Sequence, residues 1–332
     1  MKFDKIFSEI FKSFPPPKFL DIPFAGLAIS DRAIHCIQFA KKNDSLYIEK
    51  YTEKDIPVGV VTSGQINNKE ALTTLLSDLK KELNLKYVKV SLPEEKGYLF
   101  TAKIPMVESA EVVSAIESKI EENVPVPGGE LCFDYKLVEH QEKEHLDVVV
   151  SAVPISVVDS YVEAVTLSGL SPLSLEIESQ SITRALLPKK SKGTVLIVNF
   201  TTGKVGLYVA TNRVVSFTST VAIGGEVSKN PNFLAQEIKK LYIYWHTLKD
   251  NAEKPERKIN QIIVCGVGFP KDIIQYLSST EQSSIVLGSV WTNIFDFNVH
   301  VPEISFDKSL AYATAIGLAL PSEILIRDPL KT

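Results

Sequence analysis

The first fourteen residues alternate between apolar and polar side chains with the period of an α-helix. The apolar positions follow steps of three and four, so they share one helical face: Phe3, Ile6, Phe7, Ile10, Phe11 and Phe14. Three prolines, at 15–17, end the predicted helix and form a stiff spacer. Because so short a helix is marginal alone, its apolar face needs a surface, which its own domain, a membrane interface or a partner's groove would supply.

After this spacer the pattern changes to short apolar strands and amphipathic helices. It predicts strands over 24–29, 33–39 and 45–51, then a helix over 69–83 and a strand over 86–92. Ser30-Asp31-Arg32 forms the first turn. Three strands, a helix and a further strand make up half of an RNase H-like or actin-like core.

The opening pattern returns in the second half of the chain. Strands are predicted over 194–200, 205–210 and 213–221, and the turn between the first two reads Thr201-Thr202-Gly203-Lys204. A helix over 233–248, a strand over 260–265 and a closing helix over 310–320 follow. Two copies of one strand-turn-strand pattern are the mark of a duplicated domain.

The stretch between the two copies has its own alternation of elements. Strands are predicted over 98–103, 131–139, 147–153 and 171–177, and helices over 108–122 and 157–167. The fold class expected is α/β, an actin-like (RNase H-like) duplicated core with an inserted α+β subdomain in the first half. The expected divisions are a helix and spacer at 1–17, a first lobe at 18–97 and 178–190, the insertion at 98–177, a second lobe at 191–323 and a tail at 324–332.

Composition narrows the classes of function. The net charge of -4 argues against a nucleic-acid binder, which usually carries a basic excess. The three cysteines are far apart without a CxxC spacing, which argues against a disulfide framework or a zinc site. No apolar run reaches the ~20 residues that span a bilayer, and the N-terminus lacks the order of a signal peptide. A cytoplasmic protein is expected.

Short motifs follow one another in a fixed order and spacing over roughly residues 22–320. They are Ile104-Pro105-Met106, Ala115-Ile116-Glu117, Asn123-Val124-Pro125, Phe133-Asp134-Tyr135, Ala152-Val153-Pro154 to Tyr161, Gly169-Leu170, Pro172, Glu176 to Arg184, Gly224-Gly225, Glu237-Ile238 and Tyr242 to Trp245. Through the order and spacing of these motifs the sequence resembles the PilM family of type IV pilus assembly proteins.

The resemblance implies an actin-like fold of the FtsA type and a role as a scaffold. Such proteins sit peripherally on the inner face of the cytoplasmic membrane and hold the cytoplasmic tail of a bitopic protein, PilN. A pilus motor ATPase is a further implied partner. Two alternatives remain: an ATP-binding switch or ATPase of the actin family, and an FtsA-like membrane-associated division protein.

The nucleotide chemistry expected of this fold is weakly represented. Actin-like ATPases grip phosphates and Mg²⁺ with two Asp-x-Gly turns, whereas this chain has Ala28-Ile29-Ser30 and Asn199-Phe200-Thr201. No catalytic residue and no metal site is predicted, and ATP with Mg²⁺ is a weak expectation. The remaining candidates for nucleotide contact are Ser30, Asp31, Thr201, Thr202, Gly203, Lys204, Gly224, Gly225, Gly266 and Gly268.

Overall fold

The computed structural model describes most of the chain between residues 22 and 320. The described ranges are 22–42, 45–107, 111–138, 145–223, 231–252, 254–269, 274–275, 277, 283–295 and 301–320. The predicted N-terminal helix therefore lies outside the described residues. Among those that are described, none of the helices is both long and apolar enough to cross a bilayer.

The first lobe is built on a five-stranded sheet in which an antiparallel meander continues into two parallel strands. β1, β2 and β3 pair antiparallel, and β6 and β10 then add parallel to β1, giving the order β10-β6-β1-β2-β3. Its strands are β1 (Ala25–Ile29), β2 (Ala33–Lys42), β3 (Ser45–Asp55), β6 (Tyr87–Leu92) and β10 (Ser171–Ile177).

The second lobe repeats this topology strand for strand. β11, β12 and β13 form the antiparallel meander, and β14 and β15 add parallel to β11, giving the order β13-β12-β11-β14-β15. Its strands are β11 (Thr194–Thr201), β12 (Lys204–Thr211), β13 (Val214–Ala222), β14 (Ile259–Gly266) and β15 (Ser284–Leu287). The duplication expected from the sequence is thus present in the hydrogen-bonded order of both sheets.

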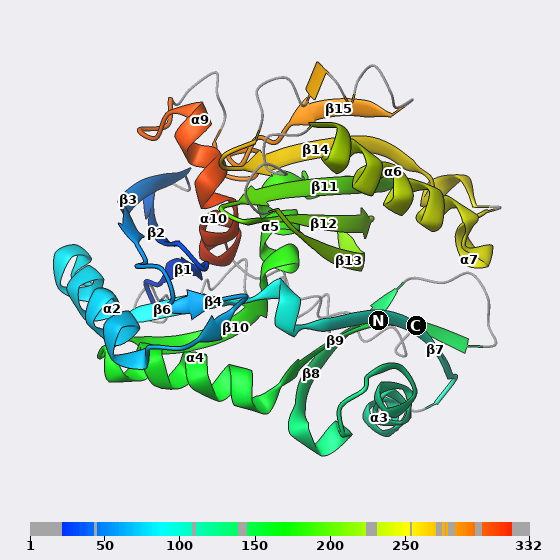
Figure 1. Cartoon of the computed structure of the whole chain (residues 1–332), viewed down its shortest axis with the longest axis horizontal. Helices are drawn as coiled ribbons and strands as arrows, with labels where there is room; N and C mark the ends of the chain where they lie inside the picture. Colours follow the sequence, from blue (N-terminus) through cyan, green and yellow to red (C-terminus); the bar gives the residue numbers. More distant parts are fainter. Residues whose placement is uncertain are drawn as a thin grey trace, which may run out of the picture.

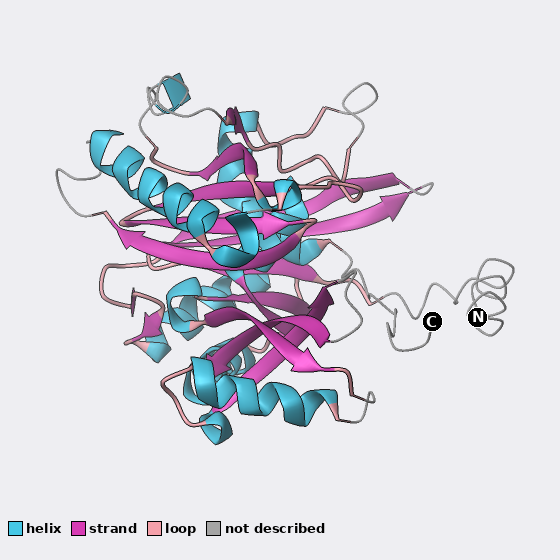
Figure 2. Ribbon diagram, turned by 90° about the vertical axis from the view of Figure 1, so that its right-hand side faces the viewer, coloured by secondary structure: helices cyan, strands magenta, loops and turns pink. Residues whose placement is uncertain are grey.

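Helices cover the outer faces of the sheets and fill the space between them (Figure 1). α2 (Lys69–Leu83) and α4 (Ile155–Leu167) pack on the first sheet, and α6 (Pro231–Thr247) packs on the second. α5 (Glu178–Leu186) and α10 (Ala313–Ala319) lie in the core that the two lobes share. Figure 2, turned by 90°, shows the sheets as separate layers with helices between and around them.

α2 shows which local signals allow a helix to be predicted from sequence. The Asn68 side chain accepts a hydrogen bond from the Ala71 amide at 3.0 Å and caps the first turn. Asn84 ends the helix in the left-handed conformation, with φ of 48°. Leu72, Leu76 and Leu79 are fully buried between these caps. Periodicity and both end signals agree, and the helix has the predicted bounds.

A third sheet belongs to the stretch inserted in the first half. β7 (Tyr98–Pro105), β9 (His145–Pro154) and β8 (Leu131–Val138) form an antiparallel sheet in that order. α3 (Val112–Asn123) packs on one of its faces. α3 begins at Val112 rather than at the predicted residue 108, and Val112, Ile116 and Ile120 form its buried face.

Several short elements connect the larger ones. They are β4 (Val61–Thr62), β5 (Gln65–Ile66), α7 (Lys249–Ala252), α9 (Phe306–Ser309) and the 3₁₀ turns η2 (Glu94–Lys96), η3 (Gly128–Glu130), η5 (Pro255–Arg257) and η6 (Leu310–Tyr312). Of these, η2 bears on function because it directly follows β6 and faces the second lobe.

Candidate functional site between the lobes

The carboxyl ends of the parallel strands from both lobes meet at one crevice. In open α/β sheets ligands bind outside these strand ends. In the first lobe β6 runs into η2, and β10 runs into α5. In the second lobe the turn after β11 leads into β12. The side chains supplied by η2, α5 and this turn define the site, which is called the interlobe cluster below.

An ion pair between the lobes is central to the interlobe cluster. Lys204 Nζ of β12 donates to Glu95 Oε1 of η2 at 2.6 Å, and both side chains are only 14% exposed. Burial opposes the charge of Lys204, but Glu178 and Glu95 outweigh it and raise the lysine pKa. The ammonium therefore remains charged and is neutralised by protein carboxylates.

Glu178 adds a second, partly buried carboxylate to the cluster. Its Oε1 accepts hydrogen bonds from Asn199 Nδ2 at 3.0 Å and from the Thr314 hydroxyl at 3.2 Å. Burial raises the pKa of Glu178, and the nearby Lys204 only partly offsets this. Because Asn199 lies on β11 and Thr314 on α10, Glu178 ties the start of α5 to the second lobe.

Glu94 anchors η2 to the same helix. Its two carboxylate oxygens accept from the backbone amide and the hydroxyl of Ser179, at 2.9 and 3.0 Å. Burial raises the pKa of Glu94 to about 7, although its hydrogen bonds to Ser179 act in the opposite direction. Neighbouring residues of η2 thus hold one position on α5 and one on β12.

The two predicted residues of the first turn act within the first lobe. The Ser30 hydroxyl donates to the Ala33 carbonyl at 2.9 Å and accepts from the Ala33 amide at 3.0 Å, which closes the β1–β2 turn. The Asp31 carboxylate accepts from the backbone amides of Ser63 and Gly64 at 2.7 and 3.0 Å. Both side chains are therefore occupied in holding backbone.

The second predicted turn does reach the site. Thr201 donates to the carbonyl of Lys204 at 3.2 Å and closes the turn. Gly203 has φ of +95° with open space around its Cα, which is the ordinary requirement of a tight turn. Of these predicted residues, Lys204 is the one whose side chain the structure pairs across the crevice.

The glycine turn after β14 has a packing role. Gly266 has φ of +89°, and a Cβ there would lie 1.9 Å from the Phe200 carbonyl oxygen. Only glycine allows β14 to approach β11 this closely. Gly268 also has a positive φ, of +76°, but nothing lies near it. Gly224 and Gly225 fall outside the described residues.

Among the described residues, those of the interlobe cluster do not fit a magnesium-bound polyphosphate in this arrangement. Lys204 is already paired, and Glu95 and Glu178 would repel phosphate oxygens. The pocket they share with Asn199 and Tyr208 has no room even for a water molecule, and a polyphosphate is far larger. Within the described ranges, no group of three or more His, Cys, Asp or Glu side chains could hold a metal ion.

Sequence reasoning missed the acidic half of the cluster. Glu94 and Glu95 follow the apolar strand β6 by two and three positions, and Glu178 follows β10 immediately. The position of these acidic residues just beyond the ends of buried strands is the sequence signal that predicts a place in the site. The Asp-x-Gly pattern belongs to the antiparallel turns after β1 and β11, so it carries no information about these positions.

Comparison with known proteins identifies the family. The family described as Type IV pilus assembly protein PilM matches residues 26–261, which is more than half of the chain. The chain belongs to the PilM family. No curated protein matches it.

Solved structures bear out the actin-like fold of this PilM family member. A chain of the "PilM-PilN type IV pilus biogenesis complex" matches with a TM-score of 0.75 and 17% identity, over 90% of this chain and 98% of that chain. MreB5 of Spiroplasma citri, solved bound to ADP, matches with a TM-score of 0.50 and 11% identity, over 90% of this chain and 95% of that one. At these identities the likeness shows the fold alone.

Proposed function

We propose that this PilM family member is an actin-like scaffold that binds the cytoplasmic tail of a bitopic, PilN-like inner-membrane protein. Family membership makes it a type IV pilus assembly protein. The likeness to a chain of a PilM–PilN complex supports the choice of partner. The proposed place of work is the inner face of the cytoplasmic membrane, where the bound tail would connect the membrane protein to the pilus motor ATPase.

The Lys204–Glu95 ion pair is the observation that supports the scaffold role. In an actin-like ATPase the crevice between the lobes is where nucleotide and metal hold the two halves together. Here a lysine and carboxylates of the protein itself bridge that crevice. We infer that the lobes stay together without nucleotide, so the tail-binding surface needs no ATP to form. The alternative, an ATP-dependent switch, requires this ion pair to open.

Tail binding should be independent of nucleotide. A synthetic peptide of the co-encoded bitopic protein's cytoplasmic tail is titrated into the full chain by calorimetry, with and without ATP and Mg²⁺. Because the crevice is already bridged, the dissociation constant should agree within about twofold between the two conditions, a difference of ~0.4 kcal/mol. Titration of ATP and Mg²⁺ alone should give no binding heat.

Three results bear on the choice of function. Tail binding without nucleotide supports the scaffold. Tail binding only in the presence of ATP would support the ATP-dependent switch and contradict the scaffold hypothesis. A peptide that fails to bind under either condition would remove the PilN-like partner from the proposal.

We further propose that the predicted N-terminal helix contacts a membrane or a partner through its apolar face. The proline spacer supports this, since it separates the helix from β1. Replacing Phe7 and Phe11 by Asp should release the protein from the membrane fraction at least tenfold while the melting temperature stays unchanged. The measurement is membrane co-sedimentation beside thermal unfolding of the same samples.

A control places a charge on the polar face. The Ser8→Asp variant adds a carboxylate on the face that holds Lys5 and Lys12, away from the stripe of Phe7 and Phe11, and it should stay membrane-associated. Unfolding of the Phe7→Asp and Phe11→Asp variant would show instead that the stripe packs on its own domain.

A further inference from the structure

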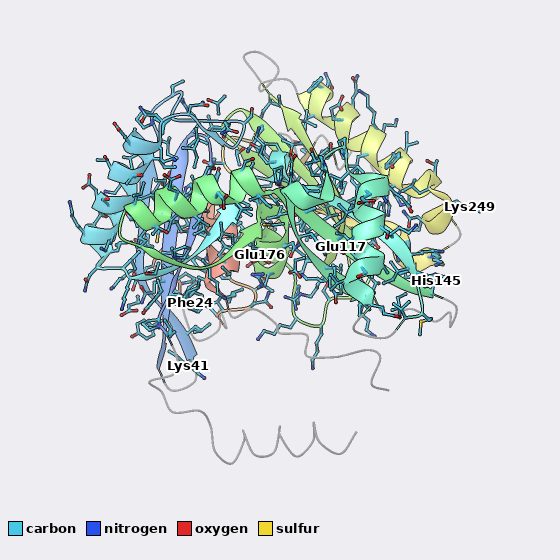
Figure 3. All side chains as sticks on the ribbon, turned by 90° about the horizontal axis from the view of Figure 1, so that it is seen from below. Phe24, Lys41, Glu117, His145, Glu176 and Lys249 are labelled. Atoms are coloured by element: carbon cyan, nitrogen blue, oxygen red, sulfur yellow. The ribbon has the colours of Figure 1, made fainter. Side chains whose placement is uncertain are left out.

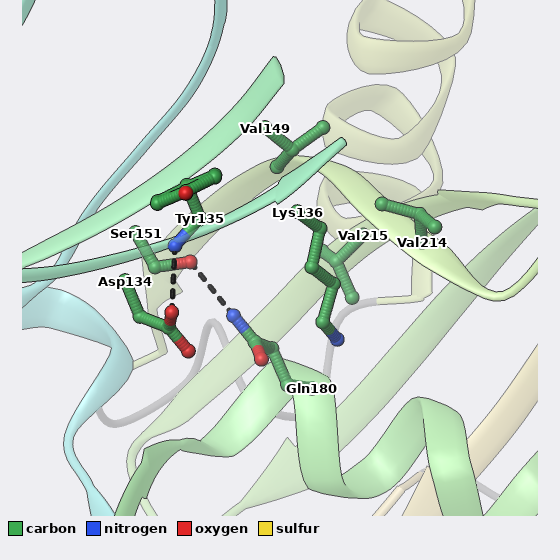
Figure 4. A pocket seen from close by; sticks show the side chains of 8 residues that line it. All are labelled: Asp134, Tyr135, Lys136, Val149, Ser151, Gln180, Val214 and Val215. Carbon is green, nitrogen blue, oxygen red and sulfur yellow. Dashed lines mark hydrogen bonds between the residues drawn. The ribbon is translucent and has the colours of Figure 1, made fainter. Parts of the chain in front are cut away.

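A second pocket lies away from the interlobe cluster, between the inserted sheet and the second lobe (Figure 4). Successive residues of a strand face opposite sides. Val148 and Val150 of β9 therefore join the core under α3, while Val149 and Ser151 face the pocket. The pocket is small and is lined by Asp134, Tyr135, Lys136, Val149, Ser151, Gln180, Val214 and Val215.

Lys136 is the unusual member of this lining. It projects from β8 toward α5 on the sheet face that the second lobe covers (Figure 4). Among the described residues, no acceptor lies within hydrogen-bonding or ion-pair distance of its Nζ, in contrast to Lys204. A half-buried ammonium without a close acceptor is costly unless something supplies a negative charge.

The charges around Lys136 do not provide that compensation. Glu176, the strongest attractive charge, is already held by both terminal nitrogens of Arg184. Figure 3 shows Glu176 in the middle of the molecule, seen from below. Burial lowers the pKa of Lys136, and Arg184 and Arg213 lower it further, while Glu176 and Asp134 oppose them.

The pocket also holds neutral groups suited to an oxyanion. Gln180 Nε2 of α5 donates to the Ser151 hydroxyl oxygen at 2.7 Å. Since Ser151 accepts in this bond, its own O–H is left to donate. A carboxylate has two oxygens with several lone pairs and accepts from an ammonium and a hydroxyl together. In Figure 4 the Ser151 hydroxyl points toward the Gln180 amide, Lys136 projects on the other side of that amide, and all three residues line the pocket.

We propose that this pocket is an oxyanion-binding site that takes a single carboxylate-sized group on Lys136 and Ser151. The group comes either from a free small anion or from an acidic side chain or chain end of a bound partner. The partner source rests on the proposed function, whereas the free-anion source does not. In both cases the ligand places a negative charge next to the Lys136 ammonium, which has no close acceptor among the described residues.

The site is tested by NMR of the lysine side chains in the full chain, with sodium acetate and then inorganic phosphate as probes. Ionic strength is held constant with chloride. The Lys136 signal, assigned by its loss in Lys136→Met, should shift saturably, and its pKa should rise when the probe is bound. Lys136→Met should weaken acetate binding at least tenfold, whereas Lys136→Arg retains the charge and binds within a fewfold of wild type.

Lys190→Met is the matched control, because Lys190 is exposed and outside the pocket. It should bind acetate as wild type does. The second arm adds the partner's tail peptide, with its carboxyl groups intact or converted to amides. A Lys136 shift that requires the carboxyl groups assigns the anion to the partner, and a shift with acetate or phosphate alone assigns it to a free anion.

Each remaining outcome separates this inference from the proposed function. If neither probe nor intact peptide moves the Lys136 signal, there is no oxyanion site, and a peptide that still binds leaves the scaffold function standing. If the peptide does not bind but acetate shifts Lys136, the site stands and the PilN-like partner fails. Equal acetate affinity in wild type and Lys136→Met would overturn the site outright.

Discussion

Replacing Lys204 by Met is expected to cost about 3 kcal/mol of the free energy of unfolding at pH 7, because it leaves buried carboxylates without their cation. Lys204 is the positive charge that pairs with Glu95 and lowers the energy of ionised Glu178. Methionine keeps the length and most of the packing of the lysine stem. The measurement is equilibrium denaturation of wild type and variant in the same buffer.

A double-mutant cycle shows whether the loss comes from the ion pair. Adding Glu95→Gln to Lys204→Met removes one stranded carboxylate, so the double variant should be more stable than the single one, with a coupling energy above ~1 kcal/mol. Strictly additive losses would mean that the pair does not hold the lobes together.

The pH dependence gives a second signature of the same loss. The folded pKa of Glu178 is already above the unfolded value of 4.5, and loss of Lys204 raises it further. A carboxyl group with a raised folded pKa destabilises the protein above that pKa and ceases to do so below the unfolded value. The deficit of Lys204→Met should therefore shrink as the pH falls from 7 toward 4.5. A deficit that is constant over this window would contradict the charge argument.

Replacing Gly317 by Ala is the second change with a large expected effect. A Cβ at Gly317 would lie 1.8 Å from the Ser181 carbonyl oxygen, where α10 crosses α5. Both contacting groups are backbone, so relief requires the helices to separate. The separation would also disturb Arg184, which donates to the Gly317 carbonyl at 2.9 Å. We expect a loss of about 3 kcal/mol or more in thermal or denaturant unfolding.

Gly128→Ala serves as the control for this substitution. Nothing lies within 4 Å of a Cβ at Gly128, so this change should stay within about 0.5 kcal/mol of wild type. If Gly317→Ala also left the free energy of unfolding unchanged, that result would contradict the close backbone contact between α10 and α5. The crossing matters for function because α5 begins with Glu178, whose position in the interlobe cluster depends on it.

The Lys204 ion pair and the Gly317 crossing both stabilise the contact between the lobes, and an actin-like ATPase binds its nucleotide between its lobes. The lobes are joined by η2, α5 and β12 through charged and hydroxyl side chains, and by α10 through close backbone packing. Contacts of this kind keep the lobes in one relative position, and a scaffold that presents a constant surface to a partner requires this. Opening and closing would instead require breaking several buried polar contacts at once.

Much of the fold was determined by local pattern alone. Periodicity and caps define α2 from Lys69 to Leu83, and the repeated strand-turn-strand units predict two sheets of one topology. The same reading found the turn that carries Lys204, because turn residues between two apolar runs are a short-range signal. It also showed that both Asp-x-Gly turns are absent, since that needs only the order of residues.

Tertiary structure alone decided what these residues do. Glu95 and Lys204 are 109 positions apart, and Lys136 and Gln180 come from different subdomains. Sequence gives the type of each residue, but whether a charge finds a partner depends on which strand ends the fold brings together. Lys204 meets a carboxylate across the crevice, whereas no acceptor among the described residues lies within bonding distance of Lys136 Nζ. That difference separates the interlobe cluster from the proposed oxyanion site, and no local sequence pattern predicts it.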